Sequence, residues 1–109
     1  MALDDLTMIL QRLGQALEGL GVRVELLVLF GSRVAGTATE TSDFDVLVVS
    51  PSFEGLGVWQ RAVLLGDAVW QLRLPIEAVA VTPEEWTTAT RPLVSMVKAQ
   101  KNLLYRPAA

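Results

Sequence analysis

The sequence predicts a single α/β domain of 109 residues, built on a mixed β-sheet. Segments with apolar residues at helical spacing alternate along the chain with short apolar segments typical of strands. About half of the residues, 51%, are hydrophobic, which suffices for a core without disulfides. Strands that alternate with helices form a layered sheet, and we expect the helices to lie mainly on one face of it.

The first half of the chain predicts one helix and two strands. Residues 3–20 carry Leu and Ile at helical spacing, and Gly21 ends this helix. Residues 22–30 alternate at first and then become continuously apolar, as in a strand buried on both faces. Residues 31–42 are rich in Gly, Ser, Thr and Ala, which predicts a loop with room for a short helical turn. Residues 43–49 predict the second strand.

The next segments predict a helix over residues 56–74 and a third strand over residues 76–81. Trp59, Val63 and Trp70 fall on one face of this helix. Such a stripe belongs more often to a core or an interface than to a ligand site. If the stripe is exposed, it favours an oligomer or a partner protein.

The end of the chain predicts a last helix and a short strand. Residues 82–85 read Thr-Pro-Glu-Glu, with Thr as N-cap, Pro at the first helical position and Glu at the third. This helix is expected to break near residues 91–92 and to resume to about Asn102. Residues 103–105 are apolar and suit a short edge strand.

The composition excludes several classes of site and partner. The chain has no Cys and no His, so disulfides, thiolate metal sites and a Ser-His-Asp triad are excluded. The net charge of −3 disfavours nucleic acid as a direct partner, because its backbone is bound by Lys and Arg. The N-terminus does not resemble a secretory signal, and no apolar run approaches the roughly 20 residues that span a bilayer. We therefore expect no membrane contact and a cytoplasmic location.

Two short motifs carry the chemistry of the sequence. Gly31 and Ser32 follow the first predicted strand, where backbone amides and a hydroxyl can meet a phosphate. The alternative is a plain strand-to-helix turn with Ser32 as N-cap. Asp43 and Asp45 open the second strand and point to the same face. Paired carboxylates suit one or two Mg²⁺ ions that also bind phosphates, although two solvated aspartates give the same pattern.

The combination of these motifs favours a nucleotide site, because they lie at the ends of two successive strands. Ten residues separate the Gly-Ser pair from the Asp-x-Asp pair. In this spacing the chain resembles the nucleotidyltransferase superfamily that includes DNA polymerase β. Within it, the chain is similar to the minimal nucleotidyltransferases, often encoded beside a HEPN-domain protein. The residues that carry the resemblance are Gly31, Ser32, Arg33, Gly36, Ser42, Asp43 and Asp45.

The resemblance implies a polymerase β-like fold and a metal-dependent transfer reaction. A nucleoside monophosphate, foremost AMP from ATP, would pass to a hydroxyl with release of pyrophosphate. The acceptor would be a hydroxyl on a HEPN partner, which makes the chain the antitoxin of a toxin–antitoxin pair. The alternative is a non-catalytic module that binds a nucleotide or a partner. Transfer to RNA is disfavoured by the acidic charge.

The resemblance also implies roles for individual residues. Nucleotide binding falls to Gly31, Ser32, Arg33 and Ser42, and metal binding and catalysis fall to Asp43, Asp45 and a third carboxylate. Arg33 has a second interpretation, a structural or solvated arginine. The only acidic residue on the third predicted strand is Glu77, where the family usually has Asp. It faces the same side as Val79 and Val81 by strand alternation, and its alternative is a solvated strand residue.

Overall fold

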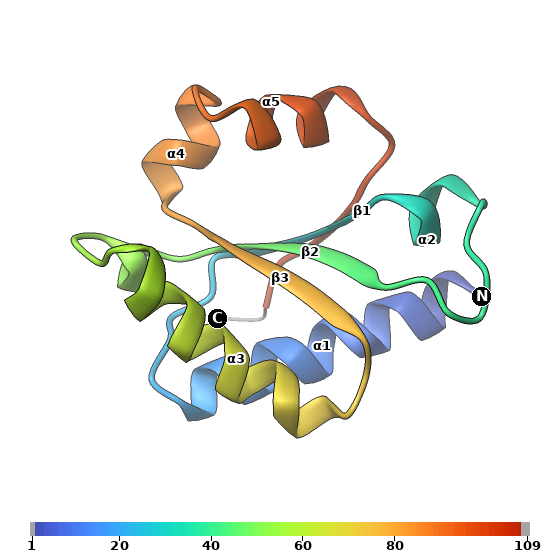
Figure 1. Ribbon diagram of the computed structural model, residues 1–109, viewed down its shortest axis with the longest axis horizontal. Coiled ribbons are helices and arrows are strands. Elements are labelled where there is room, and N and C mark those ends of the chain that lie inside the picture. Colours follow the sequence, from blue (N-terminus) through green and yellow to red (C-terminus); the bar gives the residue numbers. More distant parts are fainter. Residues whose placement is uncertain (1, 108–109) are drawn as a thin grey trace.

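The computed structural model describes residues 2–107, which form a four-stranded sheet with helices on both faces (Figure 1). The order of elements agrees with the sequence prediction, including the short turn after the first strand and the last edge strand. In chain order the elements are α1 (Leu3–Gly19), β1 (Leu26–Phe30), α2 (Ser32–Ala35), β2 (Phe44–Val49), the 3₁₀ turn η1 (Pro51–Phe53), α3 (Val58–Leu72), β3 (Ile76–Val81), α4 (Pro83–Thr88), α5 (Pro92–Ala99) and β4 (Leu103–Tyr105).

The sheet is mixed, as predicted, with the strand order β3-β2-β1-β4. Strand β1 runs antiparallel to both β2 and β4, whereas β2 and β3 are parallel. The end of β1 therefore lies beside the start of β2, and β3 starts at the same end of the sheet on the far side of β2. This topology brings the Gly-Ser turn, the Asp-x-Asp pair and the third-strand glutamate to the same end of the sheet.

Alternating side chains of β2 build two cores, one on each face of the sheet. Val46 and Val48 pack with α1 and α3, while Leu47 and Val49 pack with α5. The two long helices share one face, as expected for most of the helical residues. The short helices α4 and α5 cover part of the other face (Figure 1), because Val94 and Val97 of α5 are apolar and fully buried.

Strand β1 begins later than the predicted range 22–30 because side chains bind the backbone before it. The N–H of Arg23 donates to Ser52 Oγ at 3.0 Å, and the N–H of Val24 donates to Glu18 Oε1 at 2.9 Å. Because these amides already have side-chain acceptors, they do not need to hydrogen-bond to a neighbouring strand.

The last two helices follow from their caps. Thr82 caps α4 as predicted: its Oγ1 accepts the N–H of Glu85 at 3.1 Å, and Glu85 Oε1 accepts the N–H of Thr82 at 2.8 Å. Helix α5 ends at Ala99, short of Asn102, whose side-chain amide donates to the carbonyl of Val97 at 3.0 Å. Over residues 2–107, none of the helices combines the length and the apolar character that crossing a membrane requires.

The tryptophan stripe of α3 lies outside the core. Trp59, Val63 and Trp70 are 84%, 64% and 67% exposed, so the expectation of core positions is wrong. Helix α3 buries its opposite face, with Leu65 and Leu72 against the sheet and α1. An interface remains the other prediction for the stripe.

Candidate active site

Asp45 and Glu77 lie on the face of the sheet that α4 and α5 partly cover, with Asp43 nearby. Asp45 pairs with Phe30 of β1 and, across the parallel strands, with Glu77 of β3. Residues in register on neighbouring strands point to the same face, so Glu77 lies on the face predicted for it. Asp45 is partly buried, and Asp43 and Glu77 are exposed.

The three carboxylates of this cluster are negatively charged groups that repel one another. The pKa of Asp45 is raised above its ordinary value, first by burial and then by the negative charges of Glu77 and Asp43. The ion pairs found within residues 2–107 are all made by Glu85, at the other end of β3. The carboxylate cluster therefore has no ion pair with a protein cation in the described chain.

The donor set fits a hard divalent cation, because it consists of carboxylate oxygens whose repulsion such an ion would relieve. As the side chains stand, no three His, Cys, Asp or Glu residues between 2 and 107 enclose a point where a metal ion could bind. Asp43, Asp45 and Glu77 thus share one surface without converging. The metal-binding role of the three residues stays a prediction.

Gly31 lies against the cluster at a distance that only glycine permits. Its φ is +80°, in the left-handed region, and a Cβ placed on it would lie 2.5 Å from Asp45 Oδ2. The turn after β1 and the partly buried aspartate are therefore in direct contact. Glycine is therefore needed at position 31 both for its backbone conformation and for its contact with Asp45 in the site.

Ser32 begins α2 but does not cap it. Gly31 is the N-cap, and its carbonyl accepts the N–H groups of Val34 at 3.1 Å and Ala35 at 3.0 Å. The interpretation of Ser32 as an N-cap is therefore wrong. Within residues 2–107 the Ser32 hydroxyl makes no hydrogen bond to the protein, and the first amides of a helix have no intrahelical partner. These donors can bind an anion beside the carboxylates.

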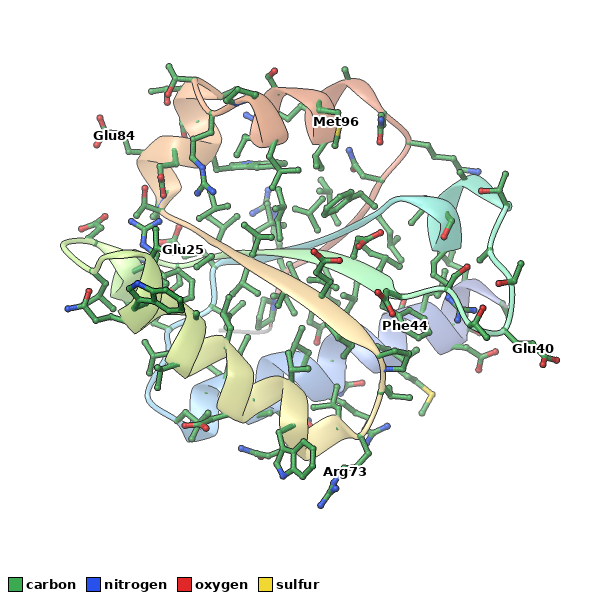
Figure 2. All side chains as sticks on the ribbon, in the orientation of Figure 1. Glu25, Glu40, Phe44, Arg73, Glu84 and Met96 are labelled. Carbon is green, nitrogen blue, oxygen red and sulfur yellow. The ribbon has the colours of Figure 1, made fainter. Side chains whose placement is uncertain are left out.

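Arg33 braces the start of β2. Its Nε and Nη2 donate to the carbonyl oxygen of Ser42 at 3.2 and 2.7 Å, and its guanidinium lies 4.4 Å from the ring centroid of Phe44. Figure 2 shows Phe44 at the start of β2. Asp43 stands between these two contact points. The structure thus favours the structural interpretation of Arg33, and its role in nucleotide binding stays a prediction.

Ser42 has its groups engaged inside the loop. Its hydroxyl accepts the N–H of Thr39 at 2.9 Å, and its carbonyl accepts both bonds from Arg33. Gly36, with a φ of +85°, ends α2 in the left-handed conformation. The loop between the two motifs is therefore held by its own polar groups, and Ser42 as a nucleotide ligand is untested.

Comparison with known proteins decides the family. The model of the nucleotidyltransferase domain family matches residues 8–101. The chain belongs to this family. Among curated proteins, none matches this nucleotidyltransferase domain at a significant level.

Two solved structures resemble the domain, and both are provisionally assigned as nucleotidyltransferases. One, from Sulfolobus solfataricus, has a TM-score of 0.61 and 18% identity, over 87% of this chain and 73% of the other. The second has a TM-score of 0.50 and 21% identity, over 95% of this chain and 98% of the other. At such identities the likeness supports the fold alone.

A hollow of about 480 Å³ in the nucleotidyltransferase domain lies toward the opposite end of β3 and is lined in part by Arg61, Glu85 and Arg91. Burial disfavours the charged form of Glu85, but the Thr82 N–H and the two arginines outweigh it and lower its pKa. Glu85 lies 2.8 Å from Arg61 and 3.4 Å from Arg91. We therefore assign this hollow a structural role. The sequence indicated only the capping role of Glu85, because its two arginines are distant along the chain.

Proposed function

We propose that this nucleotidyltransferase domain transfers a nucleoside monophosphate, foremost AMP from ATP, to a hydroxyl acceptor. The proposal depends above all on the placement of Asp43, Asp45 and Glu77 beside the Gly31–Ser32 turn. Carboxylates on one side and free amide and hydroxyl donors on the other are what a metal-bound triphosphate requires.

In the proposed reaction, Asp43, Asp45 and Glu77 hold Mg²⁺, which when bound supplies neutralisation of the phosphate charge. The hydroxyl of Ser32 and the first amides of α2 bind the β- and γ-phosphates. The acceptor oxygen forms a bond to the α-phosphorus while the bond to the leaving pyrophosphate breaks. The carboxylate of Glu77 takes the acceptor proton. Positioning and charge compensation then account for catalysis.

The proposed acceptor is a hydroxyl on a HEPN-domain protein, in the cytoplasm, where nucleoside triphosphates are made. Its support is the resemblance of the motif spacing to that of minimal nucleotidyltransferases. In this role the domain would be the antitoxin that modifies its partner.

A non-catalytic binding module is the second candidate. Two observations favour it: Glu77 stands where the family usually has Asp, and the three carboxylates do not enclose an ion position. Glutamate reaches one methylene farther than aspartate, and small errors in placement can cost much of the rate.

Incubation of the full chain with Mg²⁺, α-³²P-labelled ATP and the HEPN protein separates the two candidates. Label on the partner that is lost in Asp45→Asn and kept in Asp67→Asn supports transfer. Asp67 is the matched control because it is an exposed aspartate of α3, away from the motifs. A stable complex that stays unlabelled, and that survives Asp45→Asn, supports the binding module instead.

The variants Glu77→Asp and Glu77→Gln test the third carboxylate. If Glu77 takes the proton, Glu77→Gln loses labelling while Glu77→Asp keeps it. Equal labelling by the wild type and Glu77→Gln would remove Glu77 from the mechanism and leave the two aspartates in it.

A further inference from the structure

Helix α3 exposes an apolar stripe that the proposed reaction does not use. Its members are Trp59, Val63, Gly66 and Trp70, which follow one another at helical spacing on the side away from the buried face. The larger three are each more than 60% exposed. Four of the nine large hydrophobic residues exposed in residues 2–107 lie on this one helix. Isolated exposed residues are ordinary, but a contiguous stripe marks an interaction surface.

We infer that this stripe binds the same stripe of a second copy of the chain, with the two α3 helices antiparallel about a twofold axis. A twofold interface must be self-complementary, so that residue i meets j while j meets i. When Trp59 is set opposite Trp70 of the second copy, Val63 falls opposite Gly66. Because of the twofold axis, the Trp59–Trp70 pair and the Val63–Gly66 pair each occur twice in the interface.

The shapes of the central pair support this register. Gly66 has no heavy atom within 4 Å of the position of a Cβ, and it borders a hollow of about 430 Å³ beside Trp70. The branched side chain of Val63 from the other copy can enter this hollow as a knob enters a hole. A glycine beside a large apolar residue lets the two helices approach closely.

The charges at the ends of the stripe fit the same orientation. Glu54 precedes the start of α3, and Arg73 follows its end. An antiparallel pair brings each Arg73 toward the Glu54 of the other copy. Arg73 lies 4.2 Å from the Trp70 ring centroid and extends from the helix end (Figure 2), where its guanidinium edge can still bind a carboxylate.

The area of the stripe is consistent with the apolar centre of a dimer interface. The two tryptophans, 84% and 67% exposed, together expose roughly 380 Å² at ~250 Å² each, while a standard interface buries about 800 Å² on each partner. The valine, the helix flanks and the charged ends would supply the remainder. Aromatic residues at the centre and charges at the rim match the usual composition of such interfaces.

Sedimentation and light scattering of the full chain, over a range of concentrations, test the inference. We expect a dimer that dissociates on dilution, with a red shift of tryptophan emission as Trp59 and Trp70 become solvated. Val63→Arg should give a monomer, and Gly66→Leu should weaken association at least tenfold by filling the hollow. Met8→Arg, which places the same charge at an exposed apolar site of α1, should leave the dimer unchanged.

Charge exchange at the rim fixes the orientation. Glu54→Lys and Arg73→Glu should each weaken association, and the double variant should restore it. A chain that stays monomeric at concentrations well above micromolar overturns the inference, as does a dimer that Val63→Arg leaves intact. Failure of the double variant to recover overturns the antiparallel register.

Discussion

The carboxylates at the two ends of β3 lie in opposite electrostatic surroundings. At the start of the strand, Glu77 faces Asp45 with Asp43 nearby, and the pKa of Asp45 is raised. Beyond the end of the strand, Glu85 accepts hydrogen bonds from a backbone amide and two arginines, and its pKa is lowered. Burial disfavours the charged form of the carboxylate at both ends, and the difference is whether the protein supplies hydrogen-bond donors and positive partners that outweigh it.

This difference distinguishes the candidate functional site at the start of β3 from the structural contacts of Glu85 beyond its end. A carboxylate with its partners in place contributes stability at neutral pH and has little left to offer a ligand. A cluster of like charges costs stability until a cation compensates it. Such clusters are typical of functional sites. The start of β3 is therefore the end to disrupt for activity, and the other end is the one to disrupt for stability.

The largest effect is expected from Asp45→Asn. Loss of one carboxylate that positions the reacting group should lower transfer at least ~100-fold. Stability should change in the opposite direction, because a raised pKa means that the native state holds the Asp45 proton more tightly. The ionised group costs stability as pH rises above 3.8, its ordinary value, and through the folded pKa.

Thermal unfolding without divalent ions checks this sign. Asp45→Asn should melt above the wild type at pH 7, and the difference should disappear below pH 3.8. Asp67→Asn, an exposed aspartate of α3, should change neither labelling nor melting appreciably. A variant that melts well below the wild type at neutral pH would contradict the like-charge interpretation of the cluster.

Gly31→Ala is expected to harm both stability and activity. The combination of φ +80° and ψ −155° is adopted almost only by glycine and costs about 1–3 kcal/mol for a residue with a Cβ. This Cβ would also displace the Asp45 carboxylate, 2.5 Å away. Gly36→Ala is the control for a positive φ alone, since Gly36 has φ +85° and ψ 13°, in the left-handed helical region, with open space around its Cβ position. Denaturant unfolding should show the larger loss for Gly31→Ala. The excess should shrink in an Asp45→Ala background, and an unchanged excess would attribute the loss to the backbone conformation of Gly31 and not to its contact with Asp45.

Glu85→Gln sharpens the comparison at the other end of β3. It weakens the capping box and both arginine contacts, and we expect a loss of about 1 kcal/mol at neutral pH with labelling unchanged. Because the pKa of Glu85 is lowered, its contribution is complete above its ordinary value of 4.5 and is lost as pH falls through the folded pKa. Glu84→Gln, at an exposed neighbour in the same helical turn, is the matched control and should cost less.

Local patterns predicted most of the fold, because turn residues bracket the elements. Strand β3 has the predicted bounds, since Pro75 precedes it and the Thr-Pro cap of α4 follows it. Strand β1 is shorter than predicted because Glu18 and Ser52, from other parts of the chain, bind the amides before it. Periodicity alone cannot identify such partners.

The same limit applies to the site. Strand alternation correctly placed Glu77 on the face of Asp45, since period two depends only on the strand itself. The apolar stripe of α3 was compatible with either a core or an interface position. Periodicity defines which residues share a face of the helix but not what covers that face. The bonds from Arg33 to Ser42 join residues nine positions apart, from α2 across the irregular loop that follows it, and no periodic pattern describes such a contact.

Arg33→Lys is expected to give the smallest effect, and it tests what holds the active end of β3 in place. Lysine keeps the charge but cannot donate two bonds from a planar group to the Ser42 carbonyl while lying over Phe44. Loosening the start of β2 should lower kcat a few-fold with KM for ATP unchanged. Arg12→Lys, an exposed arginine of α1, is the matched control. A rise in KM alone would instead indicate that Arg33 binds the nucleotide phosphates. The Gly31 turn would then have to be what holds Asp43 and Asp45 in position.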